Sequence, residues 1–391
     1  MILTPSSEAE TIKAVVAARA AHRPFTVKGG GTREGLGRPV EADDVLSTSA
    51  LAGITLYEPA ELVISARAGT PLADIEAALA ANRQRLAFEP MDHRALYGTD
   101  GAPTIGAIAA CNISGPRRIQ AGAARDHLLG LRFVNGRGEI IKSGGRVMKN
   151  VTGLDLVKLQ CGAHGTLGVI TEATFKVLPE PETSATLALC GLADAAAVAA
   201  LSASLGSPYQ VSGAAHLPAG IGADEALTLL RLEGARSSVE ERRVALAKLL
   251  APQGSAELLD AERAATLWRL IRDGVALAEP RQTTVWRLSV KPTEAPKIVA
   301  ALSKQMKVRH FYDWGGGLIW LAVAEEGDAH GIRAAVADGG HAILIRAPRE
   351  LRARVDVFAP LSPPLLKITA GIKASFDPDR IINPGRMYAG I

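Results

Sequence analysis

The spacing of apolar residues in the first 80 positions changes between helical and extended periods. The pattern Ser7-Glu8-Ala9-Glu10 is typical of a capping box, and the apolar residues after it recur at helical spacing. Phe25-Thr26-Val27 and Leu62–Arg67 have the composition of strands, and a second helix is predicted from Pro71 onward. This order predicts a βαβ-like opening unit.

Extended patterns then continue to about residue 180. Leu128–Val134 and Glu139–Lys142 flank the dipeptide Asn135-Gly136, a strong signal for a β-hairpin. Leu167–Leu178 reads as one long strand, and the polar, proline-containing stretch Pro179–Glu182 reads as a linker. We therefore predict a first domain over residues 1–180.

The order strand, helix, two strands, helix, strand occurs twice in the second half, which predicts an antiparallel sheet covered by helices. The fold class is therefore α+β, with a cap domain over 184–360 and a closing helix and tail over 361–391 that return to the first domain. The predicted strands are Thr186–Cys190, Leu227–Leu232, Trp286–Val290, Val308–Tyr312, Leu318–Val323 and His341–Ile345, and the helices lie near Asp194–Leu205, Val239–Leu250, Ala261–Val275, Ala295–Gln305 and Leu361–Phe376.

Three glycine-rich segments punctuate the first domain, at Lys28–Thr32, Thr104–Gly115 and Gly162–Ile170. Glycine permits positive φ and close backbone approach, so that main-chain amides can converge on an anion such as phosphate. Taken singly, each segment also fits an ordinary tight turn or a close-packed helix end. Together they predict a long ligand with a pyrophosphate and flat rings at both ends, such as a dinucleotide.

Composition narrows the function classes. The 391 residues carry a net charge of +4 without a block of like charges, which disfavours a nucleic-acid partner. The three cysteines, Cys111, Cys161 and Cys190, have no disulfide, redox or iron–sulfur spacing, which fits a reducing cytosol. No signal peptide and no membrane-spanning run is expected.

The glycine segments, together with Asn383-Pro384-Gly385, resemble the vanillyl-alcohol-oxidase (PCMH) type of FAD-binding oxidoreductase. Within that family, Tyr57–Pro71, Ser114–Arg118 and Gly144–Asp155 resemble the flavin subunits of bacterial glycolate oxidase. The resemblance covers most of residues 1–180. It is thinner over the cap, where Asp313–Gly316 is its best segment.

The resemblance implies a two-subdomain FAD-binding domain and a complex with a second flavin subunit and an iron–sulfur subunit. Such a complex oxidises a small 2-hydroxy acid, glycolate, and passes electrons toward the membrane, so the chain is expected to be cytoplasmic and peripheral to the inner membrane. The cofactor-binding residues that it implies are Gly29, Gly30, Gly31, Thr32, Pro90, Thr104, Ile105, Gly106, Ala109, Ser114, Gly115, Gly122, Arg125, Asp126, Gly165, Thr166, Gly168, Val169, Ile170 and Asn383.

The sequence also departs from the family. Ala107 stands where members usually have a second glycine. Thr32 stands where some members carry the histidine that bonds flavin covalently, so we predict non-covalent FAD. The paired-histidine metal motif of some D-2-hydroxyacid dehydrogenases has no equivalent, so we predict no metal.

Catalytic residues remain unassigned at this stage. Oxidation of a 2-hydroxy acid needs a cation for the carboxylate and a base for the hydroxyl. The candidates are Arg281, Arg287 and Arg346 for the first role and His310, Tyr312 and His341 for the second, none at a diagnostic spacing. Lys149, Asn150 and Asp155 form a polar turn or a helix cap, and Arg117-Arg118 form a docking or steering pair or a solvated loop.

Two other functions stay open. The chain could be a self-sufficient FAD-dependent D-2-hydroxyacid dehydrogenase or oxidase. It could also be a non-catalytic assembly subunit that keeps the flavin fold.

Overall fold

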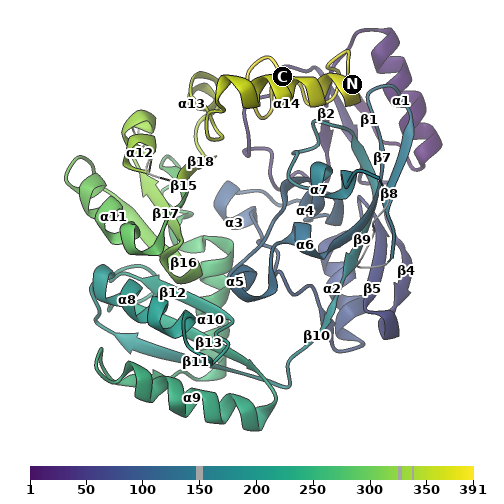
Figure 1. Ribbon diagram of the computed structural model, residues 1–391. Helices are drawn as coiled ribbons and strands as arrows, with labels where there is room; N and C mark the ends of the chain where they lie inside the picture. The colour runs from purple at the N-terminus through teal and green to yellow at the C-terminus, as the bar shows by residue number, and fades with distance from the viewer. Residues whose placement is uncertain (147–152, 325–327, 337–338) are drawn as a thin grey trace.

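The computed structural model describes residues 1–146, 153–324, 328–336 and 339–391. It has an N-terminal region with two main sheets and a cap region with one large sheet, which stand side by side in Figure 1. The last helix crosses back over the N-terminal region, so that both chain ends lie close together (Figure 1). The predicted α+β class is confirmed.

The N-terminal region begins with a small sheet in the order β1-β3-β2, in which both strand pairs are parallel. A second sheet of five strands, β4-β5-β9-β7-β8, is antiparallel throughout. The bounds are β1 Ile2–Leu3, β2 Phe25–Lys28, β3 Asp44–Ser47, β4 Ile54–Glu58, β5 Val63–Arg67, β6 Gln84–Arg85, β7 Leu128–Val134, β8 Ile140–Gly144, β9 Val169–Lys176 and β10 Leu178–Pro179.

The opening unit differs from the prediction. Strands β2 and β5 belong to different sheets, because β2 pairs with β3 whereas β5 pairs antiparallel with β4 and β9. The predicted hairpin is present as β7 and β8, with the Asn135 side chain accepting the amide of Arg137 at 2.9 Å. The single long strand predicted over Leu167–Leu178 is instead divided between β9 and β10.

Helices of this region are short, apart from the first. Ser7 caps α1 by accepting the amide of Glu10 at 3.2 Å, as the sequence pattern predicts. The described helices are α1 Glu8–Ala20, α2 Leu72–Ala80, α3 Arg94–Tyr97, α4 Ile105–Cys111, α5 Arg118–Ala121, α6 Ala124–His127 and α7 Leu156–Gln160. None of the described helices is long and apolar enough to cross a membrane.

The cap region contains the predicted repeat, strand-helix-strand-strand-helix-strand, twice over. Its sheet has the order β14-β11-β13-β12-β16-β17-β15-β18, so that the two repeats mirror one another across the β12–β16 pair. The first repeat is β11 Thr183–Cys190, α8 Asp194–Leu205, β12 Gly213–Leu217, β13 Leu227–Gly234, α9 Arg236–Leu250 and β14 Ala256–Leu258; the second is β15 Thr284–Ser289, α11 Ala295–Ser303, β16 Arg309–Asp313, β17 Leu318–Val323, α12 Ala329–Ala335 and β18 His341–Arg346. Strands β12 and β14 were not predicted.

The two faces of the cap sheet pack differently. One face carries the repeat helices, with Leu230 and Leu321 in the apolar clusters beneath them. The opposite face joins a cluster that runs from Phe311 of β16, through α10 (Ala261–Asp273), to Phe88 of the N-terminal region. Alternation along each strand therefore decides which side chains face the N-terminal region.

Buried ion pairs cross this interface. Arg117 and Arg85 bind the Glu233 carboxylate of β13 at 2.6 and 2.9 Å, and Arg231 binds Glu89 at 3.0 Å. Burial opposes ionisation of Glu233, but the hydrogen bonds of Arg117 and the nearby arginine charges outweigh it and lower its pKa. Arg117 therefore connects the two regions. The sequence predicts either a docking or steering pair or a solvated loop for Arg117-Arg118, and neither prediction includes this ion pair within the chain.

A polar cluster lies where the two cap repeats meet. The Oδ2 atom of Asp194, the first residue of α8, accepts hydrogen bonds from Tyr312 at 2.7 Å and from His310 Nε2 at 2.8 Å. His216 Nε2 lies 3.4 Å from the other carboxylate oxygen. The β12–β16 pairing has a single bridge, His216 to Tyr312, so these side chains support a junction with little backbone pairing.

We expect Asp194→Asn to lower the free energy of unfolding by about 2 kcal/mol at pH 7, because charged hydrogen bonds are the stronger kind. Burial opposes the carboxylate, but its partners lower the pKa of Asp194 below the ordinary value. Its stabilisation is therefore present above the unfolded pKa of about 3.9 and is lost as pH falls below it. Urea unfolding at several pH values should show the difference in unfolding free energy unchanged from pH 7 to about pH 5 and shrinking as the pH falls below about 4.

Asp224→Asn is the matched control, because Asp224 is an exposed cap residue with no partner among the described residues. Equal stabilities of wild type and Asp194→Asn at pH 7 would contradict this role for the cluster.

Candidate functional site

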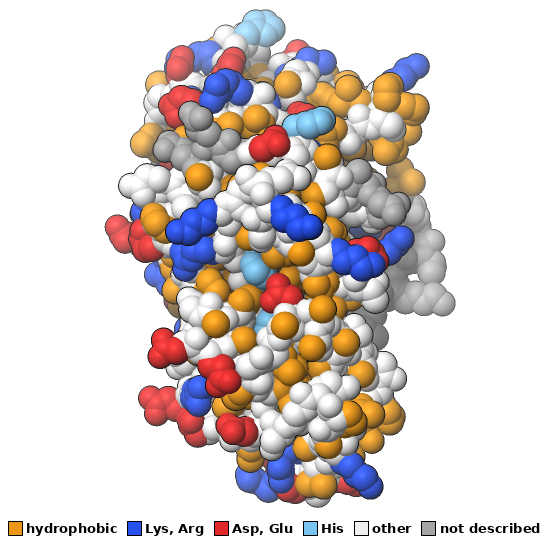
Figure 2. Space-filling model, turned by 90° about the vertical axis from the view of Figure 1, so that its left-hand side faces the viewer, with side chains coloured by type: hydrophobic (Ala, Val, Ile, Leu, Met, Phe, Trp, Pro, Cys, Tyr) orange, Lys and Arg blue, Asp and Glu red, His pale blue; other side chains and the backbone are white. Residues whose placement is uncertain are grey.

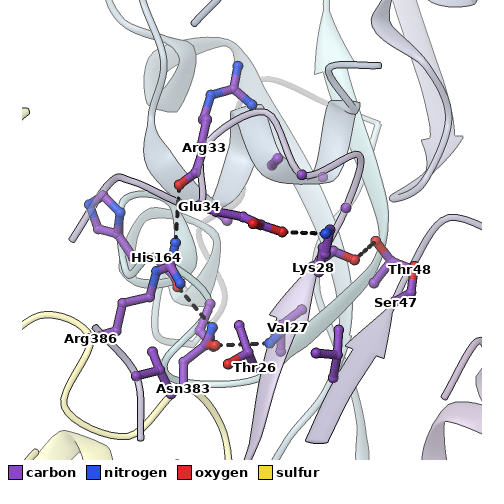
Figure 3. A pocket seen from close by; sticks show the side chains of 18 of the residues that line it. Thr26, Val27, Lys28, Arg33, Glu34, Ser47, Thr48, His164, Asn383 and Arg386 are labelled. Carbon is purple, nitrogen blue, oxygen red and sulfur yellow. Dashed lines mark hydrogen bonds and ion pairs between the residues drawn. The ribbon is translucent and has the colours of Figure 1, made fainter. Parts of the chain in front are cut away.

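A cavity of about 630 Å³ opens in the N-terminal region, within the range of roughly 300–1,000 Å³ typical of small-molecule and cofactor pockets. It is lined by the loop after β2, by α4, by the turn at His164-Gly165, and by α13 (Arg349–Arg354) with the C-terminal tail. In Figure 3, side chains of the loop after β2, of His164 and of the tail residues Asn383 and Arg386 lie around one space. The residues come from both ends of the chain.

The loop after β2 presents a row of unused main-chain donors. Within the described part of the chain, the amides of Gly29, Gly30, Gly31, Thr32 and Arg33 donate no hydrogen bond. All five residues line the cavity. A buried or half-buried amide without a partner is rare in folded proteins, so this row predicts a ligand with acceptor oxygens.

The glycines of this loop are required by close backbone packing. A Cβ atom at Gly30 would lie 1.7 Å from the carbonyl oxygen of Ala102, and one at Gly29 would lie 2.5 Å from Thr104 Oγ1. Gly31 has φ +75°, which favours glycine directly. The loop therefore packs directly against the chain at Ala102 and Thr104, with no room for a side chain at Gly29 or Gly30.

The cavity is strongly cationic. A single carboxylate, Glu34, is found among its described lining residues, and it forms an ion pair with Lys28 (Figure 3). Cationic side chains reach the cavity from three parts of the chain: Lys28, Arg33, Arg38, Arg349, Arg352 and Arg386. A dianionic pyrophosphate would offset this charge, because buried or half-buried cations attract anions more strongly than cations in water do.

Two lining side chains keep buried polar atoms without a partner among the described residues. Arg33 Nη1 is one, although the same guanidinium contacts His93 Nδ1 at 3.2 Å. His164 Nδ1 is the other, and burial lowers the pKa of His164 to about 3, so its ring is neutral. Together with the free amides, these atoms fit a polar, anionic ligand.

Asn383 lies at the centre of the cavity wall but uses its side chain within the protein. Its Oδ1 accepts the amide of Val27 at 2.9 Å, and its Nδ2 donates to the carbonyls of His164 and Gly165 at 3.2 and 3.0 Å (Figure 3). Asn383 thus joins β2 to the turn at His164-Gly165, in the third glycine-rich segment. These bonds give its side chain a positioning role, and its contact with the cofactor stays a prediction.

The predicted cofactor residues divide into two groups. Gly29, Gly30, Gly31, Thr32, Gly106, Gly165, Gly168, Ile170 and Asn383 line the cavity. The others do not line it: Pro90, Thr104, Ile105, Ala109, Ser114, Gly115, Gly122, Arg125, Asp126, Thr166 and Val169. For both groups the contact with the cofactor stays a prediction.

Several members of the second group have defined roles within the chain. Ser114 Oγ accepts the amide of Ala124 at 2.9 Å, and the Asp126 carboxylate accepts the amide of Ala123 at 2.8 Å. Ile105, Ala109 and Val169 are core residues. These residues shape the segments that border the cavity.

The three arginines predicted as candidates to bind a substrate carboxylate differ in the partners that they already have. Arg346 donates to the carbonyls of Leu96, Leu277, Ala278, Pro280 and Thr283 and to the Thr283 hydroxyl, so its guanidinium is fully used. Arg281 is paired with Glu279 at 2.7 Å. Arg287 forms no ion pair or hydrogen bond among the described residues and lies on the face of the cap sheet toward the N-terminal region.

The three candidates for the catalytic base differ in the face of the cap sheet on which they lie. His310 and Tyr312 are bonded to Asp194 on the helix-covered face of the cap sheet, away from the N-terminal region. Strand alternation excludes them as bases at the interface. His341, at the start of β18, remains.

The remaining polar-turn residues are partly accounted for. Asp155 caps α7 by accepting the amide of Lys158 at 3.1 Å, which is the helix-cap interpretation. Lys149 and Asn150 lie outside the described residues.

Sequence reasoning missed most of the cavity cations. Arg349, Arg352 and Arg386 are more than 300 positions from the glycine loop, and their spacing carries no motif. The only sequence signal for them was the prediction that the C-terminal tail returns to the first domain. Arg33 directly follows Thr32 and could have been found from the loop motif.

The fold and the cavity define an FAD-binding protein of the α+β, two-region type. The profile of the family described as "FAD binding domain" matches residues 1–144. The chain is 37% identical over 368 residues to "Glycolate oxidase subunit GlcE" of Escherichia coli, covering 94% of this chain and 93% of that protein. The chain therefore belongs to the GlcE family of FAD-dependent oxidoreductases.

Other similarities are partial or structural. "Glycolate oxidase subunit GlcD" of Bacillus subtilis is 46% identical over 95 residues, 24% of this chain and 20% of that protein. "D-lactate dehydrogenase" of Archaeoglobus fulgidus is 32% identical over 190 residues, 48% and 41% of the two chains. The solved structure of an alkyldihydroxyacetonephosphate synthase has a TM-score of 0.70 at 16% identity, covering 98% of this chain and 76% of that one, which supports the fold alone.

We expect Gly30→Ala to weaken FAD binding at least about tenfold, a cost of about 1.4 kcal/mol. The new Cβ would collide with the Ala102 carbonyl, so the loop must shift and its amides turn. FAD titration of the apoprotein measures the change. Gly371→Ala is the control, because a Cβ there meets nothing within 4 Å; unchanged affinity in Gly30→Ala would contradict the assignment of the loop.

We also expect acid denaturation to release all the FAD into the supernatant. Thr32 stands at the position of the histidine that bonds flavin in some family members, and threonine has no ring nitrogen for such a bond. Flavin fluorescence remaining with the protein band on a denaturing gel would contradict non-covalent binding.

Proposed function

We propose that the chain is the FAD-binding subunit of a glycolate oxidase complex, in which electrons from glycolate leave through an iron–sulfur subunit. The similarity to subunit GlcE across nearly the whole of both chains carries the proposal. A second relative is also named a glycolate oxidase subunit, and it matches a stretch of 95 residues.

Bound FAD supplies the acceptor for the electrons and the hydrogen that leave the C2 carbon of a 2-hydroxy acid. The chain's own contribution is to hold that group. Gly29 to Arg33 line the cavity with amides that donate no hydrogen bond among the described residues, and Arg33 and Arg386 would offset the negative charge of the pyrophosphate. Asn383 fixes the distance between β2, just before the loop, and the turn at His164-Gly165.

We place a second flavin subunit and an iron–sulfur subunit as partners, and we place the complex in the cytoplasm beside the inner membrane. The chain's three cysteines support the need for a separate iron–sulfur subunit, because Cys111, Cys161 and Cys190 are fewer than the usual four ligands of one such cluster and lie in different elements. Figure 2 shows charged side chains of both signs across the cap face, which fits a protein partner better than nucleic acid.

The test is purification of the tagged chain from its native cells, with analysis of flavin, iron and dye reduction by glycolate. We expect FAD on the chain, iron in the assembled complex, and glycolate-dependent dye reduction that requires the partners. Full activity of the recombinant chain alone would favour a self-sufficient dehydrogenase. A chain that assembles without flavin would favour an assembly role, and either result contradicts the proposal.

A further inference from the structure

Two arginines approach one tryptophan at the interface between the N-terminal and cap regions. The Cζ atom of Arg118, at the start of α5, lies 4.7 Å from the ring centroid of Trp314, and that of Arg287, on β15, lies 5.3 Å from it. Trp314 follows β16 and donates from Nε1 to the carbonyl oxygen of Gly115 at 3.1 Å. The indole therefore connects the cap to the Ser114–Gly115 segment.

Neither guanidinium has an acidic partner. Among the residues that the structure describes, the side chains of Arg118 and Arg287 form no ion pair and donate no hydrogen bond. The Nε atom of Arg287 is buried and without a partner. Desolvation and like-charge proximity both disfavour this arrangement, and an anion between the guanidinium groups would relieve it.

The other titratable groups nearby do not supply that anion. His341 carries no negative charge in either protonation state, and burial, together with the charges of Arg287 and Arg118, lowers its pKa. Asp313 accepts the amide of Trp314 at 2.7 Å, and burial raises the pKa of Asp313 to about 7, so it is only partly ionised at neutral pH. Glu89 and Glu233 are committed to Arg231, Arg117 and Arg85.

The backbone at Trp314 is also unusual. Trp314 has φ +52°, a left-handed conformation that is uncommon for a bulky residue, and the Asp313 side chain holds its amide. Its backbone is held in the position that brings the indole to the carbonyl oxygen of Gly115 and close to both guanidinium groups. This geometry is expected where a side chain must be placed at a site rather than merely packed.

We propose that Arg118 and Arg287, positioned by Trp314, bind the carboxylate of the 2-hydroxy acid in this chain. The inference rests on the proposed function and adds that this subunit, and not its flavin partner alone, takes the substrate. Guanidinium groups recognise carboxylates through paired N–H donors, and the half-buried guanidinium of Arg287 does so more strongly than an exposed one would. One arginine comes from each region, so the site is complete only when the cap faces the N-terminal region.

The test uses oxalate, a carboxylate that this chemistry cannot oxidise, titrated into the FAD-loaded complex while the flavin absorbance is recorded. We expect Arg287→Met and Arg118→Met each to raise the oxalate Kd and the glycolate KM about tenfold or more, with FAD content unchanged. In the double variant, the oxalate Kd should rise by less than the product of the two single increases, because both arginines act on one anion.

Arg281→Met is the matched control, since Arg281 is also a cap arginine but is paired with Glu279. Arg118 is exposed, so its variant tests the site even where removal of Arg287 disturbs folding. An unchanged Kd in Arg118→Met, an equal loss in Arg281→Met, or no flavin change with wild type would each overturn the inference.

The two proposals fail separately. Oxalate binding that depends on Arg287, without glycolate oxidation by the wild-type complex, contradicts the proposed function and leaves the anion site. Glycolate oxidation with an unchanged KM in both arginine variants contradicts the anion site and leaves the proposed function.

Discussion

The hydrogen bonds of the Asn383 side chain are the contact on which the cofactor cavity depends. One side chain accepts the amide of Val27, before the glycine loop, and donates to the carbonyls at His164 and Gly165. It is almost fully buried, and its φ of +45° is one that asparagine tolerates better than most residues. A buried amide with all these bonds made fixes its neighbours strongly, because losing any bond leaves an unpaired polar group.

The same return of the tail brings charge to the cavity. Lys373 of α14 (Pro363–Phe376) is buried and donates to the Asp377 carboxylate and to the carbonyls of Thr166 and Ile382, each at 2.7 Å. This anchor fixes the start of the tail, and Arg386 at its end lines the cavity. The fold thus brings cationic side chains from distant parts of the sequence, such as Arg386, to the cavity lined by the glycine loop.

The cap is fixed by a second set of charges. Glu233 of the cap is bound by Arg85 and Arg117 of the N-terminal region. Glu89 of the N-terminal region is bound by Arg231 of the cap, so that the ion pairs cross the interface in both directions. Such networks gain little net stability over apolar packing, but breaking one partner leaves a costly buried charge. They therefore favour a single orientation of the cap, and that orientation decides which side chains of the sheet meet the N-terminal region.

The sequence by itself determined the α+β class, the hairpin at Asn135-Gly136, the duplicated cap pattern and the glycine loop, because periodicity, turn chemistry and glycine spacing are local signals. It did not separate β2 from β5 or assign faces to the cap strands, since sheet pairing depends on contacts distant in the chain. The tertiary structure alone decided that Arg346 is used by carbonyls, that His310 and Tyr312 face away, and that Arg287 has no partner among the described residues. A side chain's chemistry is local, but its partners, burial and charge balance are set by residues hundreds of positions away.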